Sequence, residues 1–179
     1  MPEDERVSVL RVTTVCSGNI CRSPIAEYVL RQALEDAGLG HAVVVDSAGI
    51  GGWHTGDPAD RRARQVLQAH GYDGEPHRAQ QITRSWFDVA GSDTAPDLLL
   101  AMDTTHYDDL VRLAPAGVEV AMMRAFDPAL SGVPHPSDEL DVPDPYYGAY
   151  DGFEDVLAMI EAATPGTVAR IRELLAERG

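Results

Sequence analysis

The sequence contains no lysine and only two cysteines, which removes several kinds of chemistry. Without lysine there is no Schiff base to a carbonyl substrate, no attachment of pyridoxal phosphate and no Walker-type G-x-x-x-x-G-K nucleotide loop. Cys16 and Cys21 are too few and too close to form a disulfide framework, which favours a reducing compartment. No apolar run approaches the roughly 20 residues of a membrane span, and residues 1–6 lack the regions of a secretory signal. We therefore expect a cytoplasmic protein without membrane insertion.

Positive charge is scarce as well. The sequence has 14 arginines and 29 acidic residues, which gives a formal net charge of -15. Such a surface repels a phosphate backbone, so we expect no nucleic acid partner. The six histidines show no metal-ligand spacing such as H-x3-H, so we predict no metal site. The 179 residues and 44% apolar content suit one globular domain over residues 1–179.

Strand-like and helix-like segments alternate along the chain. Aliphatic and β-branched runs predict strands at residues 7–15, 42–46, 98–101 and 118–122. Helical spacing predicts helices at residues 23–37, 59–69 and 104–113, which end near Gly38, Gly71 and Pro115. Two more helical stripes follow between residues 153 and 175, and Pro165 with Gly166 is predicted to separate them. The expected fold class is α/β: a single domain with a four-stranded parallel sheet and helices on both faces.

The most informative segment is C-S-G-N-I-C-R-S-P, residues 16–24, between the first predicted strand and the first predicted helix. Backbone N–H groups of such a loop, with the positive end of the helix, converge on an anion. Arg22 adds a permanently charged bidentate fork. The same field stabilises a thiolate, so Cys16 is predicted to be a nucleophile aimed at bound phosphorus. The predicted phosphate-binding loop comprises Ser17, Gly18, Asn19, Ile20, Cys21, Arg22 and Ser23.

The residue types in this loop also indicate its backbone conformation and how the following helix begins. Gly18 and Asn19 would tolerate the unusual backbone angles that turn amides inward. The alternative is an ordinary strand-helix turn with a buried cysteine and Ser23 as helix N-cap.

A second candidate lies at Asp144, which follows an irregular stretch rich in proline, glycine and acidic residues, 132–143. On its own, Asp-Pro is a common turn signal. Paired with a nucleophilic cysteine, a carboxyl group here is a candidate general acid and base. The combination favours catalysis.

These residues resemble a known family. Residues 15–24 resemble the V-C-x-G-N-I-C-R-S-P signature of the low-molecular-weight protein tyrosine phosphatases, and residues 144–148 are similar to its D-P-Y-Y acid loop. Segments 46–49, 56–60, 78–83 and 101–103 also match family segments in the same order. The resemblance thus covers nearly the whole chain.

The resemblance implies hydrolysis of phosphotyrosine through a cysteinyl-phosphate, with Cys16, Arg22 and Asp144 as catalytic residues. No cofactor is implied, the expected partners are tyrosine-phosphorylated proteins or peptides, and a monomer is favoured. Ser23 would stabilise the thiolate, Asn19 would hold the loop's shape, and Ser47 would bond to Asn19.

Roles in specificity are expected for four side chains, and the spacing of the two thiols, five residues apart, suggests a redox role for Cys21. The expected walls of an aromatic slot for a phenyl phosphate are Ile20, Trp53, Tyr146 and Tyr147. Trp53 could equally pack in the core. Cys21 is either a redox partner that traps oxidised Cys16 as a disulfide or a small buried apolar residue.

Related activities remain as alternatives. Arsenate reductases of similar fold lack the D-P-Y-Y loop and need further cysteines, whereas protein-arginine phosphatases carry threonine where Ile20 stands. A non-catalytic phosphoprotein-binding module would keep the loop without turnover. Two departures from the family pattern, Ser17 and the run Thr104-Thr105-His106, are expected to leave the chemistry untouched.

Overall fold

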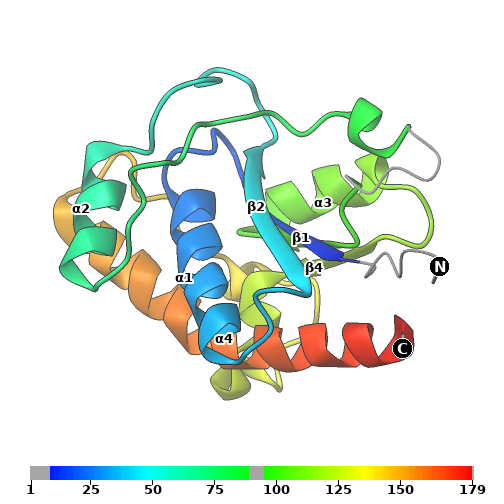
Figure 1. The fold of residues 1–179 in the computed structure, drawn as a ribbon. Helices are drawn as coiled ribbons and strands as arrows, with labels where there is room; N and C mark the ends of the chain where they lie inside the picture. Colours follow the sequence, from blue (N-terminus) through cyan, green and yellow to red (C-terminus); the bar gives the residue numbers. More distant parts are fainter. Residues whose placement is uncertain (1–8, 89–94, 179) are drawn as a thin grey trace, which may run out of the picture.

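Four parallel strands form the centre of the structure (Figure 1). The computed structural model describes residues 9–88 and 95–178. The strands lie in the order β2-β1-β3-β4, and the α/β class and the four-stranded parallel sheet predicted from the sequence are confirmed. The elements are β1 (Leu10–Cys16), α1 (Arg22–Asp36), β2 (Val43–Gly49), α2 (Arg61–Ala69), β3 (Leu98–Ala101), α3 (Thr104–Leu113), β4 (Glu119–Met122) and α4 (Tyr150–Arg178).

Helices cover both faces of the sheet, as predicted. Side chains alternate along a strand, so successive residues of β3 enter different apolar clusters. Leu98 and Leu100 pack with residues of α1 and α4, whereas Leu99 and Ala101 pack with Leu110 of α3. Figure 1 shows α1 and α4 on one side of the strands and α3 on the other. Burial on both faces explains why β3 is aliphatic throughout.

Most predicted boundaries agree with the structure to within a few residues. β1 begins at Leu10, and predicted strand residues Val7 and Ser8 lie outside the described residues. β2 continues to Gly49, three residues beyond the prediction, because Cys16 of β1 still has Gly49 as its partner in the register. Gly38 and Gly71 follow α1 and α2 with φ angles of +73° and +87°, which glycine adopts without strain.

The predicted break at Pro165 and Gly166 is wrong, because α4 runs without interruption from Tyr150 to Arg178. The helix continues because its buried face packs along the molecule on both sides of the proline. Gly166 does not end the helix but lets it pack closely against Phe126, since a Cβ atom at this position would collide with the Phe126 carbonyl oxygen. Tertiary contact therefore outweighs the lost N–H of Pro165.

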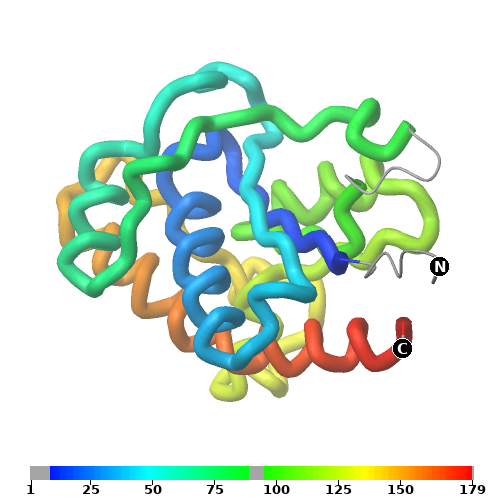
Figure 2. Tube along the Cα trace, viewed as in Figure 1, coloured from blue at the N-terminus to red at the C-terminus, as the bar shows by residue number. Residues whose placement is uncertain are grey.

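The fold brings several distant segments to the carboxyl ends of the strands, where ligands of open parallel sheets bind. β1 ends at Cys16, and the segment after β3 is joined to the later chain because the Val142 N–H donates to the Met102 carbonyl at 2.7 Å. Figure 2 shows the chain after residue 140 passing beside α2 before it enters α4. In the part of the chain that the structure describes, no helix is long and apolar enough to cross a membrane.

Candidate active site

Cys16 ends β1 and is almost completely buried at the beginning of the loop that leads into α1. We call residues 16–22 the cysteine loop. The Ser23 hydroxyl lies 2.9 Å from Cys16 Sγ and accepts a hydrogen bond from Asn19 Nδ2 at 2.8 Å. The hydroxyl also lies 3.4 Å from the Ala48 carbonyl oxygen, so its one proton has two acceptors within reach, that carbonyl and the sulfur. A proton donated to Cys16 would favour its thiolate. Ser23 lies inside α1, whose N-cap is Cys21 without a side-chain hydrogen bond, so the alternative of Ser23 as N-cap is wrong.

Asn19 has the left-handed backbone conformation, with a φ angle of +60°. Its side chain is fully buried, donates to Ser47 Oγ at 2.9 Å, and accepts from the Gln80 N–H at 2.9 Å. The expectation of an unusual backbone angle is therefore confirmed for Asn19. It is wrong for Gly18, whose φ is not positive; a Cβ atom there would lie 3.0 Å from the His54 ring, so space is the constraint.

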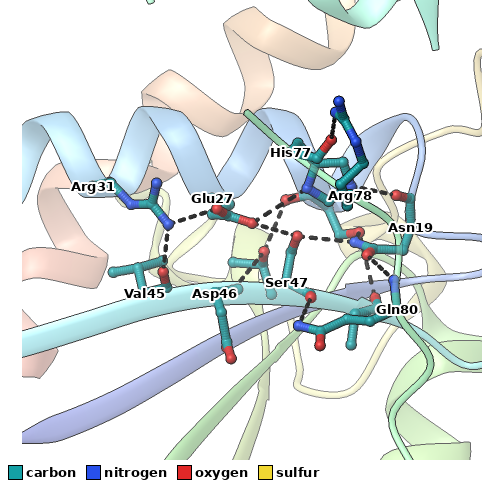
Figure 3. Close-up of polar contacts among 12 residues, drawn as sticks. Asn19, Glu27, Arg31, Val45, Asp46, Ser47, His77, Arg78 and Gln80 are labelled. Carbon is teal, nitrogen blue, oxygen red and sulfur yellow. Dashed lines mark hydrogen bonds and ion pairs between the residues drawn. The ribbon is translucent and has the colours of Figure 1, made fainter. Parts of the chain in front are cut away.

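A buried polar network extends from Asn19 away from the pocket (Figure 3). Ser47 Oγ donates to Glu27 Oε1 at 2.5 Å, and Arg31 Nη2 donates to Glu27 Oε2 at 2.6 Å. His77 Nε2 lies 2.7 Å from the Asn19 carbonyl oxygen. The network ties the cysteine loop to α1, β2 and the segment before η1 (Arg84–Phe87). Glu27, His77 and Gln80 were not predicted from the sequence, because their importance comes from contacts between distant segments.

Arg22 is buried at the start of α1 and is held from two sides. Its Nη1 donates to Asp103 Oδ2 at 2.9 Å and to the Val142 carbonyl at 2.9 Å. Its Nη2 lies 3.8 Å from Asp144 Oδ2. One nitrogen is thus occupied by protein acceptors, while the other faces the pocket beside Asp144.

Asp103 and His106 form a second support that was not assigned from the sequence. Asp103 caps α3 by accepting from the His106 N–H, and His106 Nδ1 accepts from the Asp103 N–H in return. Burial acts to raise the pKa of Asp103, but the neighbouring His106, its backbone N–H and Arg22 outweigh burial and lower it. Burial lowers the pKa of His106 to about 4. The ring is therefore neutral at pH 7, and the Asp103 carboxylate stays charged for Arg22.

Asp144 lies at the pocket with 45% of its side chain exposed. Its Oδ1 accepts from the Tyr146 N–H at 3.0 Å, which is the turn geometry typical of aspartate. The other oxygen faces Arg22. The turn interpretation and the position at the site are therefore both correct, and we call residues 144–148 the aspartate loop.

One pocket of about 430 Å³ brings the predicted residues together. Trp53 has 75% of its surface exposed, so the alternative that it packs in the core is wrong. Tyr146 and Tyr147 meet edge to face with ring centroids 4.9 Å apart. The lining comprises Cys16, Ser17, Gly18, Ile20, Cys21, Arg22, Trp53, His54, Asp144, Tyr146 and Tyr147.

His54 is a lining residue that was not predicted. Ser47, which was predicted, does not line the pocket and contacts the cysteine loop through its hydrogen bond with Asn19.

Cys21 is buried beside the pocket and, like Cys16, is a free thiol. Burial, followed by the charges of Asp60, Cys16 and Asp144, raises the pKa of the Cys21 thiol. Cys21 is therefore protonated at neutral pH. Within residues 9–88 and 95–178, no three His, Cys, Asp or Glu side chains are arranged to hold a metal ion.

The fold and pocket together define an α/β protein with a buried thiol, an arginine and an aspartate at the carboxyl end of a parallel sheet. The model of the family described as low molecular weight phosphotyrosine protein phosphatase matches residues 11–177. A low molecular weight protein-tyrosine-phosphatase of Streptomyces coelicolor is 51% identical over 166 residues, which cover 91% of this chain and 94% of the relative. The chain belongs to the low molecular weight protein-tyrosine phosphatase family and is a hydrolase of that class, which confirms the resemblance.

Solved structures agree with this assignment. The crystal structure of a protein tyrosine phosphatase from Entamoeba histolytica superposes with a TM-score of 0.78 at 30% identity, covering 92% of this chain and 97% of that chain. A structure described as a Drosophila arginine phosphatase superposes with a TM-score of 0.73 at 24% identity, covering 90% and 98%. The second likeness concerns the fold alone. Fold similarity therefore leaves the choice between aryl and guanidinium phosphates to the pocket residues.

Proposed function

We propose that this chain hydrolyses phosphotyrosine in proteins or peptides by a two-step reaction at Cys16. The Cys16 thiolate attacks the phosphorus in line, while Arg22 and the loop amides hold the non-bridging oxygens. Asp144, protonated, donates its proton to the departing phenolate; once ionised, it takes a proton from the water that hydrolyses the cysteinyl-phosphate. Fixed donors aimed at the transferred charge supply the electrostatic stabilisation.

The observation that carries this proposal is the meeting of three groups from distant segments in one pocket. Cys16 ends β1, Arg22 begins α1, and Asp144 comes from the loop before α4. Nη2 of Arg22 faces the Asp144 carboxylate, and Ser23 contacts the sulfur from the opposite, buried side. A phosphate held by Arg22 would therefore lie between the nucleophile and the proton donor, as in-line transfer requires.

The pocket walls support an aromatic ester as substrate. Ile20, Trp53, Tyr146 and Tyr147 line the pocket, so a phenyl ring would meet apolar and aromatic surfaces there. Ile20 offers no polar group to a guanidinium, which argues against phosphoarginine. Cys16 and Cys21 are the chain's two cysteines, which argues against an arsenate reductase that needs more. An intact set of nucleophile, arginine and acid argues against a module that only binds.

We also retain Cys21 as the proposed redox partner of Cys16. Peroxide would oxidise the Cys16 thiolate to a sulfenic acid, and the Cys21 thiol would condense with it to form a disulfide and release water. Cys21→Ser should leave the rate of phosphate ester hydrolysis near normal. After peroxide treatment, however, the variant should regain activity more slowly than the parent when a thiol reductant is added. Equal recovery of the variant and the parent would remove this role.

The two-step proposal is tested with substitutions at the two reacting residues. Cys16→Ser should abolish turnover in a protein that still unfolds cooperatively. Asp144→Ala should lower kcat by about 10²–10⁴-fold on aryl phosphates with poor leaving groups, and much less where the leaving group needs no proton. Retained activity in Cys16→Ser would refute the assignment of Cys16 as the nucleophile. If Asp144→Ala lowered kcat by the same factor for all leaving groups, Asp144 would not be the general acid.

A further inference from the structure

Arg62, in the first turn of α2, connects α2 to the aspartate loop. Its Nη1 donates to the Gly148 carbonyl and its Nη2 donates to the Tyr146 carbonyl, each at 2.9 Å. These two carbonyls follow Asp144 closely in the chain, so a guanidinium bound to both fixes the backbone that carries the carboxyl group. Such planar, two-pronged donation is the geometry that arginine supplies and lysine does not.

Asp60 and two aromatic rings hold the Arg62 guanidinium in turn. Nε and Nη2 donate to the two Asp60 carboxylate oxygens at 3.1 and 3.2 Å. The guanidinium carbon lies 4.5 Å from the Phe153 ring centroid and 5.8 Å from that of Tyr146. Burial acts to raise the pKa of Asp60, but hydrogen bonds from the Arg62 side chain and backbone outweigh it and lower the pKa. Asp60 therefore remains an anion that orients Arg62.

Asp60 also contacts the cysteine loop directly. Its backbone N–H donates to the Ile20 carbonyl at 2.8 Å, and its carboxylate accepts from the Arg62 N–H at 2.8 Å as the cap of α2. A continuous series of hydrogen bonds therefore runs from Ile20 through Asp60 and Arg62 to the carbonyls of the aspartate loop. This series joins the loop of the proposed nucleophile to the loop of the proposed acid.

Four of the five residues of the aspartate loop are exposed: Asp144, Tyr146, Tyr147 and Gly148, with 90% of the Tyr147 surface open to solvent. Pro145 is the buried residue of the loop. Asp144 lies 3.8 Å from Arg22, longer than a hydrogen bond. Figure 2 shows this stretch of chain beside α2, the helix that carries Arg62. Exposed backbone opens at low cost, so on the exposed side of Pro145 the two hydrogen bonds from Arg62 to the Tyr146 and Gly148 carbonyls weigh heavily.

We propose that Arg62, oriented by Asp60, is a positioning residue that holds the Asp144 carboxyl group where it can exchange a proton above Cys16. The inference rests on the proposed role of Asp144. Since Arg62 is not among the residues that line the pocket, its loss should affect proton transfer and not anion binding. Misplacement of a reacting group by about 1 Å can cost about 10²-fold in rate.

The first experiment compares Arg62→Gln with Arg64→Gln. Arg64 lies on the same helix but donates to the Ala59 carbonyl and Glu75, away from the aspartate loop. Arg62→Gln should lower kcat about tenfold to hundredfold on poor leaving groups, leave the inhibition constant of inorganic phosphate within about twofold, and steepen the dependence on leaving-group pKa. Arg62→Lys should not restore the rate, and Arg64→Gln should behave as the parent. An Arg62→Gln enzyme with parental kcat would overturn the proposal.

A double substitution separates this inference from the proposed acid. Asp144→Asn alone tests the acid: unchanged activity there refutes the proposed function, whatever Arg62 does. If Asp144→Asn is slow, adding Arg62→Gln should cost nothing further, because the group being positioned is gone. A further tenfold loss in the double variant would show that Arg62 acts elsewhere and would refute the positioning role.

Asp60→Asn is a second test of the same arrangement, which remains informative if the Arg62 variants fail to fold. Asparagine is as good an N-cap as aspartate, so α2 should remain capped. The charge that orients Arg62 is lost, however, and kcat should fall in the same leaving-group-dependent manner by a smaller factor. Thermal unfolding of each variant shows whether it is folded at the assay temperature. A folded Asp60→Asn protein with the parental kcat and leaving-group dependence would count against the Asp60–Arg62 arrangement.

Discussion

The Ser17 hydroxyl oxygen lies 2.8 Å from Nε2 of His106, so the two residues that depart from the family pattern are partners of each other. His106 Nδ1 accepts from the Asp103 N–H, which leaves the proton of the neutral ring on Nε2. Nε2 therefore donates to Ser17, which lines the pocket next to Cys16. The two departures, which were expected to leave the chemistry untouched, thus form a specific contact between the cysteine loop and α3.

Ser17→Ala tests this contact. The substitution removes the acceptor of the His106 N–H, and 98% of the His106 surface is buried, so the free energy of unfolding should fall by about 1 kcal/mol. Ser17→Thr keeps a hydroxyl at the same atom and should be close to the parent. Urea unfolding at pH 7 measures both. Equal stability of the alanine variant and the parent would show that the bond contributes nothing.

His106 should also give stability a characteristic pH dependence. Its pKa is about 4 in the folded protein against an ordinary value of 6.5, because burial disfavours the charged ring. As the pH falls below 6.5 the unfolded chain takes up a proton that the folded chain does not, so stability decreases until about pH 4. Between pH 7 and pH 5 this histidine should cost about 2 kcal/mol.

The matched comparison for that prediction is His106→Asn. Asparagine can still accept from the Asp103 N–H at the start of α3, but it does not titrate. The difference in unfolding free energy between parent and variant should therefore change with pH in favour of the variant between pH 7 and pH 5. Parallel stability curves over that range would place the histidine pKa near its ordinary value.

Asn19 combines two requirements that substitutions can separate. Asn19→Gly keeps the φ angle of +60° available but removes three side-chain hydrogen bonds, to Ser23, Ser47 and Gln80. Asn19→Ala removes the bonds and adds backbone strain of about 1–2 kcal/mol. Both variants should lose activity, and the alanine variant should unfold at lower urea concentration than the glycine variant. The reverse order of stability would argue against the left-handed conformation.

Gly166 offers a test of the packing that carries α4 past Pro165. Gly166→Ala should destabilise the protein by about 1–3 kcal/mol, because its Cβ atom would collide with the Phe126 carbonyl. Gly152→Ala is the control in the same helix, since its Cβ atom would meet Pro145 at an ordinary 3.5 Å. The control should be neutral or stabilising by up to about 1 kcal/mol. Urea unfolding distinguishes the two, and a stabilising Gly166→Ala would contradict the packing explanation.

The parts of the site that could be predicted are those whose residues are adjacent in sequence. Cys16 to Ser23 and Asp144 to Tyr147 each concentrate unusual residue types in a few positions, and the strand and helix patterns around them are local. Asp103, His106 and Arg62 could not be assigned, because each acts through a partner far along the chain. Asp60 lies in a segment that matched the family, and both Asp60 and Arg62 lie at a predicted helix start, but neither signal pointed to the aspartate loop.

The error at Pro165 has the same origin. Local rules correctly predicted the ends of α1 and α2 at glycines with positive φ. They failed in α4, where burial of Ile160, Ala163 and Ile171 on one face holds the helix together across the proline. Tertiary packing is not visible in a window of neighbouring residues.

The most direct test of the central claim is kcat/KM on matched phosphotyrosine and phosphoarginine peptides without added metal, with Cys16→Ser protein as the blank. The account predicts turnover that prefers phosphotyrosine and vanishes in the blank, because Ile20 and the aromatic walls favour a phenyl ring and Cys16 is the nucleophile. Preference for phosphoarginine, or turnover that survives in Cys16→Ser, would contradict it.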